Sequence, residues 1–156
     1  MIETPRIVET EAQMAAVIHL TVPREEPQDV MGPALQEVID VVTAQGVMPA
    51  GPWFTHQLRL DPEVFDFELG VPVSTPVIPE GRVKPGSLPA GRVARTIYHG
   101  NCEGLGVAWA EFDTWILARG YTPGSDVWER YLIGPDTSPE PGDWRTELNR
   151  PLVEPA

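Results

Sequence analysis

The sequence predicts an α+β protein made of two pseudo-symmetric strand-helix-strand-strand modules, which form one antiparallel sheet with two helices on one face and a central cleft. Two pairs of similar segments carry this prediction. Residues 46–54 resemble residues 120–128, and residues 68–73 resemble residues 147–152, with offsets of 120 − 46 = 74 and 147 − 68 = 79. Both segments of the first pair follow an apolar helical stretch. Because 156 residues suit one ordinary core, we expect a single domain over residues 1–156 with an internal repeat.

The first module covers about residues 6–73. Residues 6–22 include a β-branched run that ends at Pro23, which predicts a strand. A helix with one buried face follows, because apolar residues recur at the i, i+3, i+4 and i+7 positions: Leu35, Val38, Ile39 and Val42. Gly46 ends this helix, and the alternation in residues 53–60 and 64–73 predicts two further strands.

The second module covers about residues 92–152 and repeats this order. The stretch 74–91 is rich in proline and glycine and is predicted to link the modules. Residues 92–98 are predicted to form a strand, and residues 127–133 and 144–152 two more. The helix between them is predicted by apolar residues at helical spacing, which are Leu105, Trp109, Phe112 and Ile116.

Composition restricts the classes of partner. The formal net charge of −12 argues against direct nucleic-acid binding, which depends on Lys and Arg at phosphates, and favours cationic ligands or serves only solubility. No apolar run reaches the length of a bilayer span, and no signal peptide is visible, so we expect no membrane partner. The single cysteine, Cys102, fits a cytoplasmic location.

The second copy differs from the first by an acid within its aromatic strand. Glu129 lies between Trp128 and Tyr131, where the first copy has Phe54 and His56. Alternation along a strand places Glu129 on one face with Tyr131, and Trp128 on the other. If the face of Glu129 is buried, its carboxylate must be hydrogen-bonded, protonated or matched by a cation.

Two interpretations of Glu129 remain open at this point. A carboxylate surrounded by aromatic rings suits a lipophilic cation, because ring faces attract positive charge. Alternatively, Glu129 faces water or pairs with Arg130 or Arg95. The aromatic residues also have a purely structural interpretation, because Trp109, Phe112 and Trp115 lie at helical spacing that is typical of a core. Trp115 is one position off the apolar stripe and is the one that could border a cleft.

Other catalytic or cofactor chemistry has no support in the sequence. The three histidines are isolated, and His99 with Cys102 offers only two soft ligands, so we expect no metal. Neither a nucleophile elbow nor a phosphate-binding loop is present, so we expect no cofactor.

The chain resembles the GyrI-like small-molecule-binding domains, which also occur as effector-binding regions of AraC-type and MerR-type multidrug regulators. The resemblance rests on several motifs in order: Asp66-Phe67-Glu68-Leu69-Gly70-Val71-Pro72-Val73, Leu88-Pro89-Ala90-Gly91-Arg92-Val93-Ala94 with His99-Gly100, Trp109…Trp115…Gly120, Trp128-Glu129-Arg130-Tyr131-Leu132, and Thr146-Glu147-Leu148…Pro151-Leu152. It implies two modules about a pseudo-dyad, with a pocket between them for hydrophobic and often cationic aromatic compounds.

The resemblance also implies a site. The acid of the family's aromatic strand corresponds to Glu129. The candidate ligand-binding residues are Glu129, Tyr131, Trp115, Tyr98, Phe54, His56 and Trp128. Two of the family's tyrosine positions differ here, because Cys102 and His56 stand at them.

Three functions follow from the resemblance. The favoured one is a stand-alone multidrug-binding protein for lipophilic, cationic aromatic compounds, because no winged-helix or helix-turn-helix segment is visible in the chain. The alternative is a hydrolase of cyclopropane-bearing genotoxins, with Glu129 as general base and Tyr98 or Tyr131 as its helper. The second alternative is a protein-contact inhibitor of a topoisomerase, whose protein partner and interface the sequence does not mark.

Overall fold

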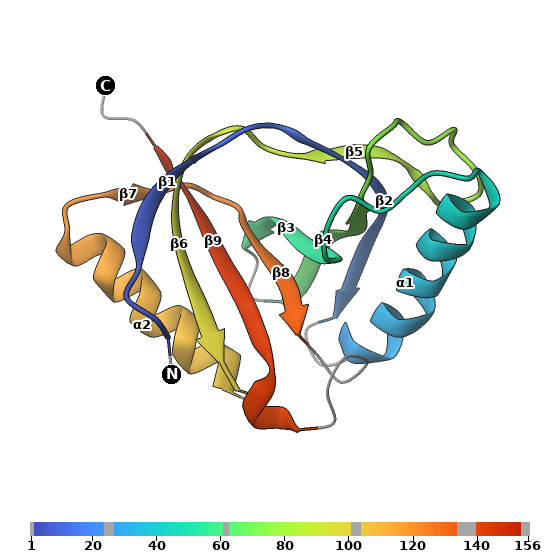
Figure 1. Ribbon diagram of the computed structural model, residues 1–156. Helices are drawn as coiled ribbons and strands as arrows, with labels where there is room; N and C mark the ends of the chain where they lie inside the picture. The colour runs from blue at the N-terminus through green and yellow to red at the C-terminus, as the bar shows by residue number, and fades with distance from the viewer. Residues whose placement is uncertain (1, 24–26, 61–62, 101–103, 134–139, 154–156) are drawn as a thin grey trace. The chain divides into compact units, whose positions relative to one another are not determined.

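The structure is a computed structural model, which describes residues 2–23, 27–60, 63–100, 104–133 and 140–153 (Figure 1). In these residues two long helices accompany strands that pair antiparallel, which confirms the predicted α+β class. The chain divides into two compact units. We call Glu11–Ala90 the N-terminal unit, and Met1–Thr10 with Gly91–Ala156 the C-terminal unit.

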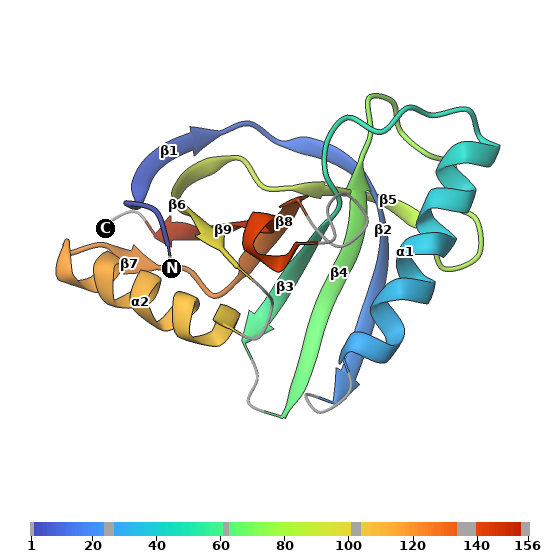
Figure 2. The same cartoon turned by 60° about the horizontal axis from the view of Figure 1, so that its bottom comes forward.

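The N-terminal unit contains one helix and four strands. Its elements in chain order are β2 (Gln13–Pro23), α1 (Pro27–Ala44), β3 (Phe54–Leu60), β4 (Val64–Pro72) and β5 (Lys84–Leu88). The strands lie in the order β3-β4-β2-β5, with every neighbouring pair antiparallel. Figure 2 shows α1 lying along β2 and β4.

The core of this unit forms between α1 and one face of its strands. Ile18 of β2 lies opposite Leu69 of β4, and both are fully buried together with Val38 and Val42 of α1. These helix positions belong to the predicted apolar stripe. Ile39 also belongs to that stripe, but it is 40% exposed, so its predicted burial is wrong.

Part of the predicted linker belongs to this sheet. β5 lies within residues 74–91 and pairs with β2 from Gln13↔Leu88 to Val17↔Lys84. Gly86 allows this close approach, since a Cβ there would lie 2.7 Å from Cγ2 of Val17. The proline in β5 is compatible with a strand at the end of the unit's strand order.

The C-terminal unit contains the other helix. Its elements in chain order are β1 (Arg6–Thr10), β6 (Gly91–His99), α2 (Leu105–Ala118), β7 (Thr122–Pro123), β8 (Val127–Ile133), a short 3-10 helix (Pro141–Asp143) and β9 (Arg145–Val153). The strands lie in the order β1-β6-β9-β8, and β7 pairs with the far end of β9. No helix in the described residues is both long and apolar enough to cross a bilayer.

The β-branched run that ends at Pro23 forms a strand as predicted, but the chain also forms a separate strand over residues 6–10 that the sequence did not predict. β1 pairs with β6, from Arg6↔Arg95 to Thr10↔Gly91, whereas β2 pairs with β4 and β5. Residues 6–10 therefore pair with the strand that follows the predicted linker, although the first predicted module starts at residue 6. The single domain remains a prediction.

The two units have the same internal topology. Each orders its strands in the same way, so that β3, β4, β2 and β5 correspond to β8, β9, β6 and β1. Both helices also end alike. Gly46 and Gly120 adopt positive φ values of 68° and 80°, and the next residue donates its backbone N–H to the carbonyl five positions earlier. The duplication predicted from the sequence is therefore a duplication of topology.

Candidate functional site

Glu129 lies in the middle of β8 in the C-terminal unit, on the same sheet face as α2. It is opposite Leu148 of β9, which is in turn opposite Thr96 of β6. Leu148 is fully buried in the cluster that packs against α2. Because cross-strand partners share a face, Glu129 faces the helix, and Tyr131 does so two residues later.

Two neutral donors hold the Glu129 carboxylate. The indole N–H of Trp109 donates to Oε2 at 2.6 Å, and the hydroxyl of Tyr131 donates to Oε1 at 2.9 Å. Trp109 comes from α2 and Tyr131 from the same strand as the acid, so helix packing and strand alternation build this site together. Each carboxylate oxygen therefore has one aromatic donor.

The protonation of Glu129 reflects this environment. Desolvation by burial raises the pKa of Glu129, while the hydrogen bonds from Trp109 and Tyr131 lower it without cancelling that effect. The charged form is therefore less favourable here than in water, because the donors carry no positive charge.

The alternative interpretation, in which Arg130 or Arg95 pairs with Glu129, is wrong. Arg130 Nη1 and Arg95 Nε lie 3.1 Å and 3.3 Å from Oε1 of Glu147. Glu147 is opposite Arg130 in the register of β8 and β9, and therefore faces away from α2. Strand alternation explains why Arg130 pairs with Glu147 and not with Glu129. Arg130 directly follows Glu129 in the strand, so its side chain points to the opposite face of the sheet.

Trp109 combines the two roles that the sequence treated as alternatives. Its ring packs against the α2 core, 5.6 Å from the ring of Phe112, while its N–H binds Glu129. The sequence indicated only the core role. A comparison of the two copies could have indicated the second role, the hydrogen bond to Glu129. The offset of 74 aligns Trp109 with Leu35 and Glu129 with Thr55. Donor and acceptor thus occur together in one copy only.

Two further predicted residues lie on the α2 side of the sheet. Tyr98 of β6 is buried in the core cluster, and its hydroxyl lies so close to Gly104 that a Cβ there would clash with it. Trp115 is partly buried on α2, with the guanidinium of Arg119 4.9 Å from its ring centroid. Tyr131, and not Tyr98, is the tyrosine bonded to Glu129.

The remaining predicted residues lie elsewhere. Trp128 is 2% exposed and belongs to the face opposite Glu129. Phe54 and His56 are buried in the N-terminal unit, on the strand that corresponds to β8. By register the position equivalent to Glu129 is Thr55 between them, because Thr55 pairs with Leu69 as Glu129 pairs with Leu148. Cys102 lies outside the described residues.

Comparison with known proteins identifies a family for this chain. The family profile of the GyrI-like small molecule binding domain matches residues 3–152. No curated protein sequence gives a significant match.

Solved structures share the fold at low sequence identity. The crystal structure of the EcmrR C-terminal domain has a TM-score of 0.85 at 20% identity, covering 97% of this chain and 98% of that one. EcmrR in its cryo-EM complex with DNA has a TM-score of 0.85 at 19% identity, covering 99% of this chain and 58% of that one. This chain therefore spans little more than half of EcmrR.

A third structure, SAV2435 bound to tetraphenylphosphonium, has a TM-score of 0.64 at 12% identity and covers 97% of this chain and 94% of that one. At such identities the likeness establishes the fold alone. The family profile, in contrast, covers nearly the whole sequence. The chain therefore belongs to the GyrI-like small-molecule-binding domain family.

Proposed function

We propose that this protein binds hydrophobic, cationic aromatic compounds in the cytoplasm, and that Glu129 is their counter-ion. One observation carries the proposal: a buried carboxylate is held by two aromatic donors and by no cation among the described residues. Both arginines that could have neutralised it pair with Glu147 instead.

The energetics favour a cationic ligand over a neutral one. Burying a carboxylate is costly unless a positive charge or hydrogen bonds compensate it, and here only hydrogen bonds do so. A lipophilic cation would supply the missing charge and bury its own apolar surface in the same step. Aromatic faces add an attraction of about 0.5–2 kcal/mol for a cation close to a ring.

The rings for such a site are available on the α2 side of the sheet. Trp109 and Tyr131 border the carboxylate directly, and we assign them the first contacts with the ligand. Tyr98 and Trp115 belong to the same α2 cluster and are proposed as outer contacts. Phe54, His56 and Trp128 stay predictions from the family resemblance. SAV2435, which shares the fold, is bound to a lipophilic cation, and this supports the proposed ligand class.

The test compares one cation with one neutral molecule of similar shape. Tryptophan fluorescence and calorimetry would measure the affinity for tetraphenylphosphonium and for triphenylphosphine oxide in wild type and Glu129→Gln. We expect the cation to bind more tightly to wild type, and Glu129→Gln to weaken it by at least about tenfold, which corresponds to about 1.4 kcal/mol. The neutral compound should change little.

The matched control is Glu111→Gln, which removes the same charge from an exposed position on α2. It should leave both affinities unchanged, because an exposed charge is screened by water and salt. Equal losses for the cation in both variants would show a general field effect and reject the counter-ion role. If the protein instead acts as an inhibitor by protein contact, Glu129→Gln should leave that inhibition unchanged.

A second candidate function is hydrolysis of an electrophilic, cyclopropane-bearing compound. The favouring observation is that the Tyr131 hydroxyl lies 2.9 Å from a carboxylate whose pKa burial raises. A carboxylate of raised pKa is a better general base near neutral pH. Glu129 would take a proton from a water molecule as the oxygen of that water attacks one carbon of the strained ring and a ring carbon–carbon bond breaks. The carbon released from the ring would then take the proton back from Glu129, so that one water is added in total. Mass analysis after incubation tests this, because hydrolysis adds one water and Glu129→Gln should abolish it.

A further inference from the structure

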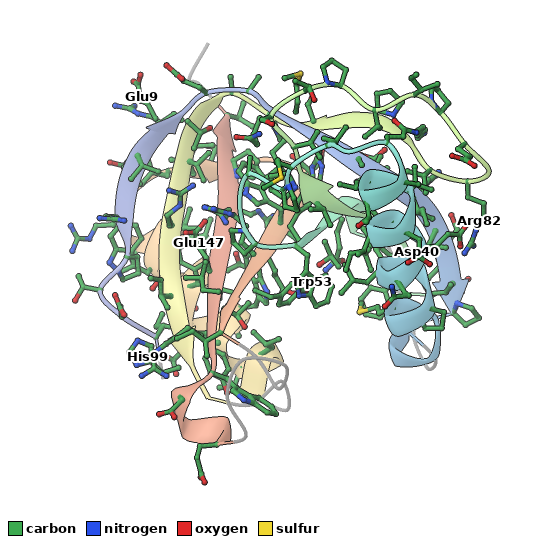
Figure 3. All side chains as sticks on the ribbon, turned by 45° about the vertical axis from the view of Figure 1, so that its right-hand side comes forward. Glu9, Asp40, Trp53, Arg82, His99 and Glu147 are labelled. Atoms are coloured by element: carbon green, nitrogen blue, oxygen red, sulfur yellow. The ribbon has the colours of Figure 1, made fainter. Side chains whose placement is uncertain are left out.

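A second charged cluster lies on the sheet face of the C-terminal unit that is opposite α2. It contains four side chains from three neighbouring strands: Arg95 of β6, Glu147 and Asn149 of β9, and Arg130 of β8. The register brings them together, since Arg95 is opposite Asn149 and Arg130 is opposite Glu147. Figure 3 labels Glu147 among them.

Three of these side chains converge on one oxygen atom. Oε1 of Glu147 lies 3.1 Å from Nη1 of Arg130, 3.3 Å from Nε of Arg95 and 3.1 Å from Nδ2 of Asn149. Asn149 is fully buried, and its Oδ1 accepts a hydrogen bond of 2.7 Å from Arg95 Nε. The buried amide thus fixes both the acid and one guanidinium.

The cluster carries an excess of positive charge. Two guanidinium groups share one carboxylate, which leaves a net charge of +1 in a chain whose formal charge is −12. Arg6 of β1 is directly opposite Arg95 and adds a third positive charge to the same row. Desolvation lowers the pKa of Arg95, the Glu147 carboxylate opposes this, and the charges of Arg130 and Arg6 lower the pKa further.

Both guanidinium groups also have unused donors. Among the described residues, Arg95 uses only Nε and Arg130 uses only Nη1 in contacts with protein acceptors. Their side chains are only 18% and 28% exposed, so water reaches the remaining N–H groups from a restricted side. A guanidinium has five donors arranged to bind planar, two-oxygen acceptors.

We infer that this Arg95–Arg130 cluster binds the carboxylate group of a small organic anion. The excess positive charge attracts an anion. The planar pair of oxygens of a carboxylate suits the free edge of a guanidinium in the bidentate geometry that such groups prefer. Glu147 already demonstrates that a carboxylate fits between the two arginines. The site is distinct from Glu129, which faces the other side of the sheet.

The experiment measures binding of benzoate to the full chain at low ionic strength by calorimetry, with benzamide as the neutral isostere. We expect benzoate to bind more tightly than benzamide. Arg130→Gln should weaken the affinity for benzoate by at least about tenfold, because it removes one positive charge and the paired N–H donors of one guanidinium. Arg130→Lys should bind benzoate with an intermediate affinity, since it keeps the positive charge and loses the paired donors of the guanidinium.

The matched control is Arg82→Gln, which removes the same charge from an exposed ion pair with Glu37 in the N-terminal unit. Benzoate affinity should stay within about twofold of wild type in this variant. In wild type, the NMR signals of the Arg95 and Arg130 Nε–H groups should shift on addition of benzoate and not of benzamide. This readout does not depend on the folding of any variant.

Four results would overturn the inference. One is equal affinity of wild type for benzoate and benzamide, and another is the same loss in Arg130→Gln and Arg82→Gln. The third is tighter binding of inorganic phosphate than of benzoate, which would replace the carboxylate by a different anion class. Unchanged Nε–H signals at saturating benzoate would place any bound benzoate elsewhere.

Discussion

The bond between Trp109 and Glu129 decides the chemistry of the α2 side of the C-terminal unit. A hydrogen bond of 2.6 Å connects a helix residue with a strand residue, so it opposes the rise in the pKa of Glu129 that burial causes, and it helps to fix the helix. The copy without the acid has Leu35 and Thr55 at the corresponding positions. The pair therefore exists as a unit in one half of the duplication.

Trp109→Phe removes the indole N–H donor and keeps an aromatic ring, so it tests the hydrogen bond separately from ring packing. The hydrogen bond from Trp109 lowers the pKa of Glu129, so its loss should raise that pKa further. A lost hydrogen bond to a charged group also costs about 1.5–3 kcal/mol of stability near neutral pH. Titration of the carboxyl carbon signal by NMR and denaturant unfolding would measure the two effects.

The control for this variant is Trp115→Phe on the same helix. The ring of Trp115 contacts Arg119 and is not a donor to Glu129. Its replacement should leave the pKa of Glu129 where it is in wild type. The same change of pKa in both variants would show that ring packing, and not the N–H group, controls the acid.

Stability should depend on pH through Glu129 in a definite direction. Because burial raises its pKa in the folded state, the native protein binds this proton more readily than the unfolded chain does. The stability gained in this way is fully present below the unfolded pKa, and it is lost as the pH rises through the folded pKa. Glu129→Gln imitates the protonated acid at every pH.

The free energy of unfolding of Glu129→Gln should therefore improve relative to wild type between pH 4 and pH 7. Urea unfolding at several pH values, followed by circular dichroism, measures the difference. A difference that is constant over this range would mean that the carboxyl group has the same proton affinity in the folded and unfolded chains.

At the scale of elements, the two helices end in the same way for the same reason. Gly46 and Gly120 both have positive φ, a region that costs an L-residue roughly 1–2 kcal/mol. A Cβ would meet nothing within 4 Å at either position, so the cost of a side chain there is conformational. The two caps are independent copies of one motif.

Gly46→Ala and Gly120→Ala should each destabilise the protein by about 1 kcal/mol, measured by chemical denaturation. The matched control is Gly106→Ala inside α2, where a Cβ also meets nothing within 4 Å and φ is not positive. Alanine there should stabilise by about 0.5–1 kcal/mol. A loss of stability in the control would show that added volume, and not backbone conformation, explains the other two variants.

At the scale of the whole molecule, charge is unevenly distributed. The formal net charge is −12, yet the face opposite α2 in the C-terminal unit gathers Arg95 and Arg130 around one carboxylate, with Arg6 opposite Arg95 on the neighbouring strand. A negative chain repels itself in the compact state, while a local positive cluster attracts anions. Net charge alone therefore does not define the ligands of this protein.

Added NaCl should raise the melting temperature between 10 mM and 200 mM. Over this range the screening length shortens from about 30 Å to below 10 Å, which weakens repulsion between distant acidic residues. KCl should act equally, because the effect is screening. A melting temperature that falls with salt would show that attractive ion pairs outweigh the repulsion.

The sequence by itself determined the local features of this protein. Residue periodicity located both helices, and the glycines Gly46 and Gly120 marked their ends. The period of two along a strand separated Glu129 from Arg130. The repeat predicted two similar modules, and the family motifs indicated small-molecule binding. These signals are local, because backbone geometry relates neighbouring positions in the chain.

Only the tertiary structure decided which distant segments meet. β1 joined β6 instead of continuing into β2, and β5 emerged from a stretch rich in proline and glycine, because pairing depends on the available neighbouring strand. Cross-strand register placed Arg130 opposite Glu147. The packing of α2 brought Trp109 into contact with Glu129, which is 20 positions away in the sequence. Such contacts depend on how elements pack, and no periodicity within one segment encodes them.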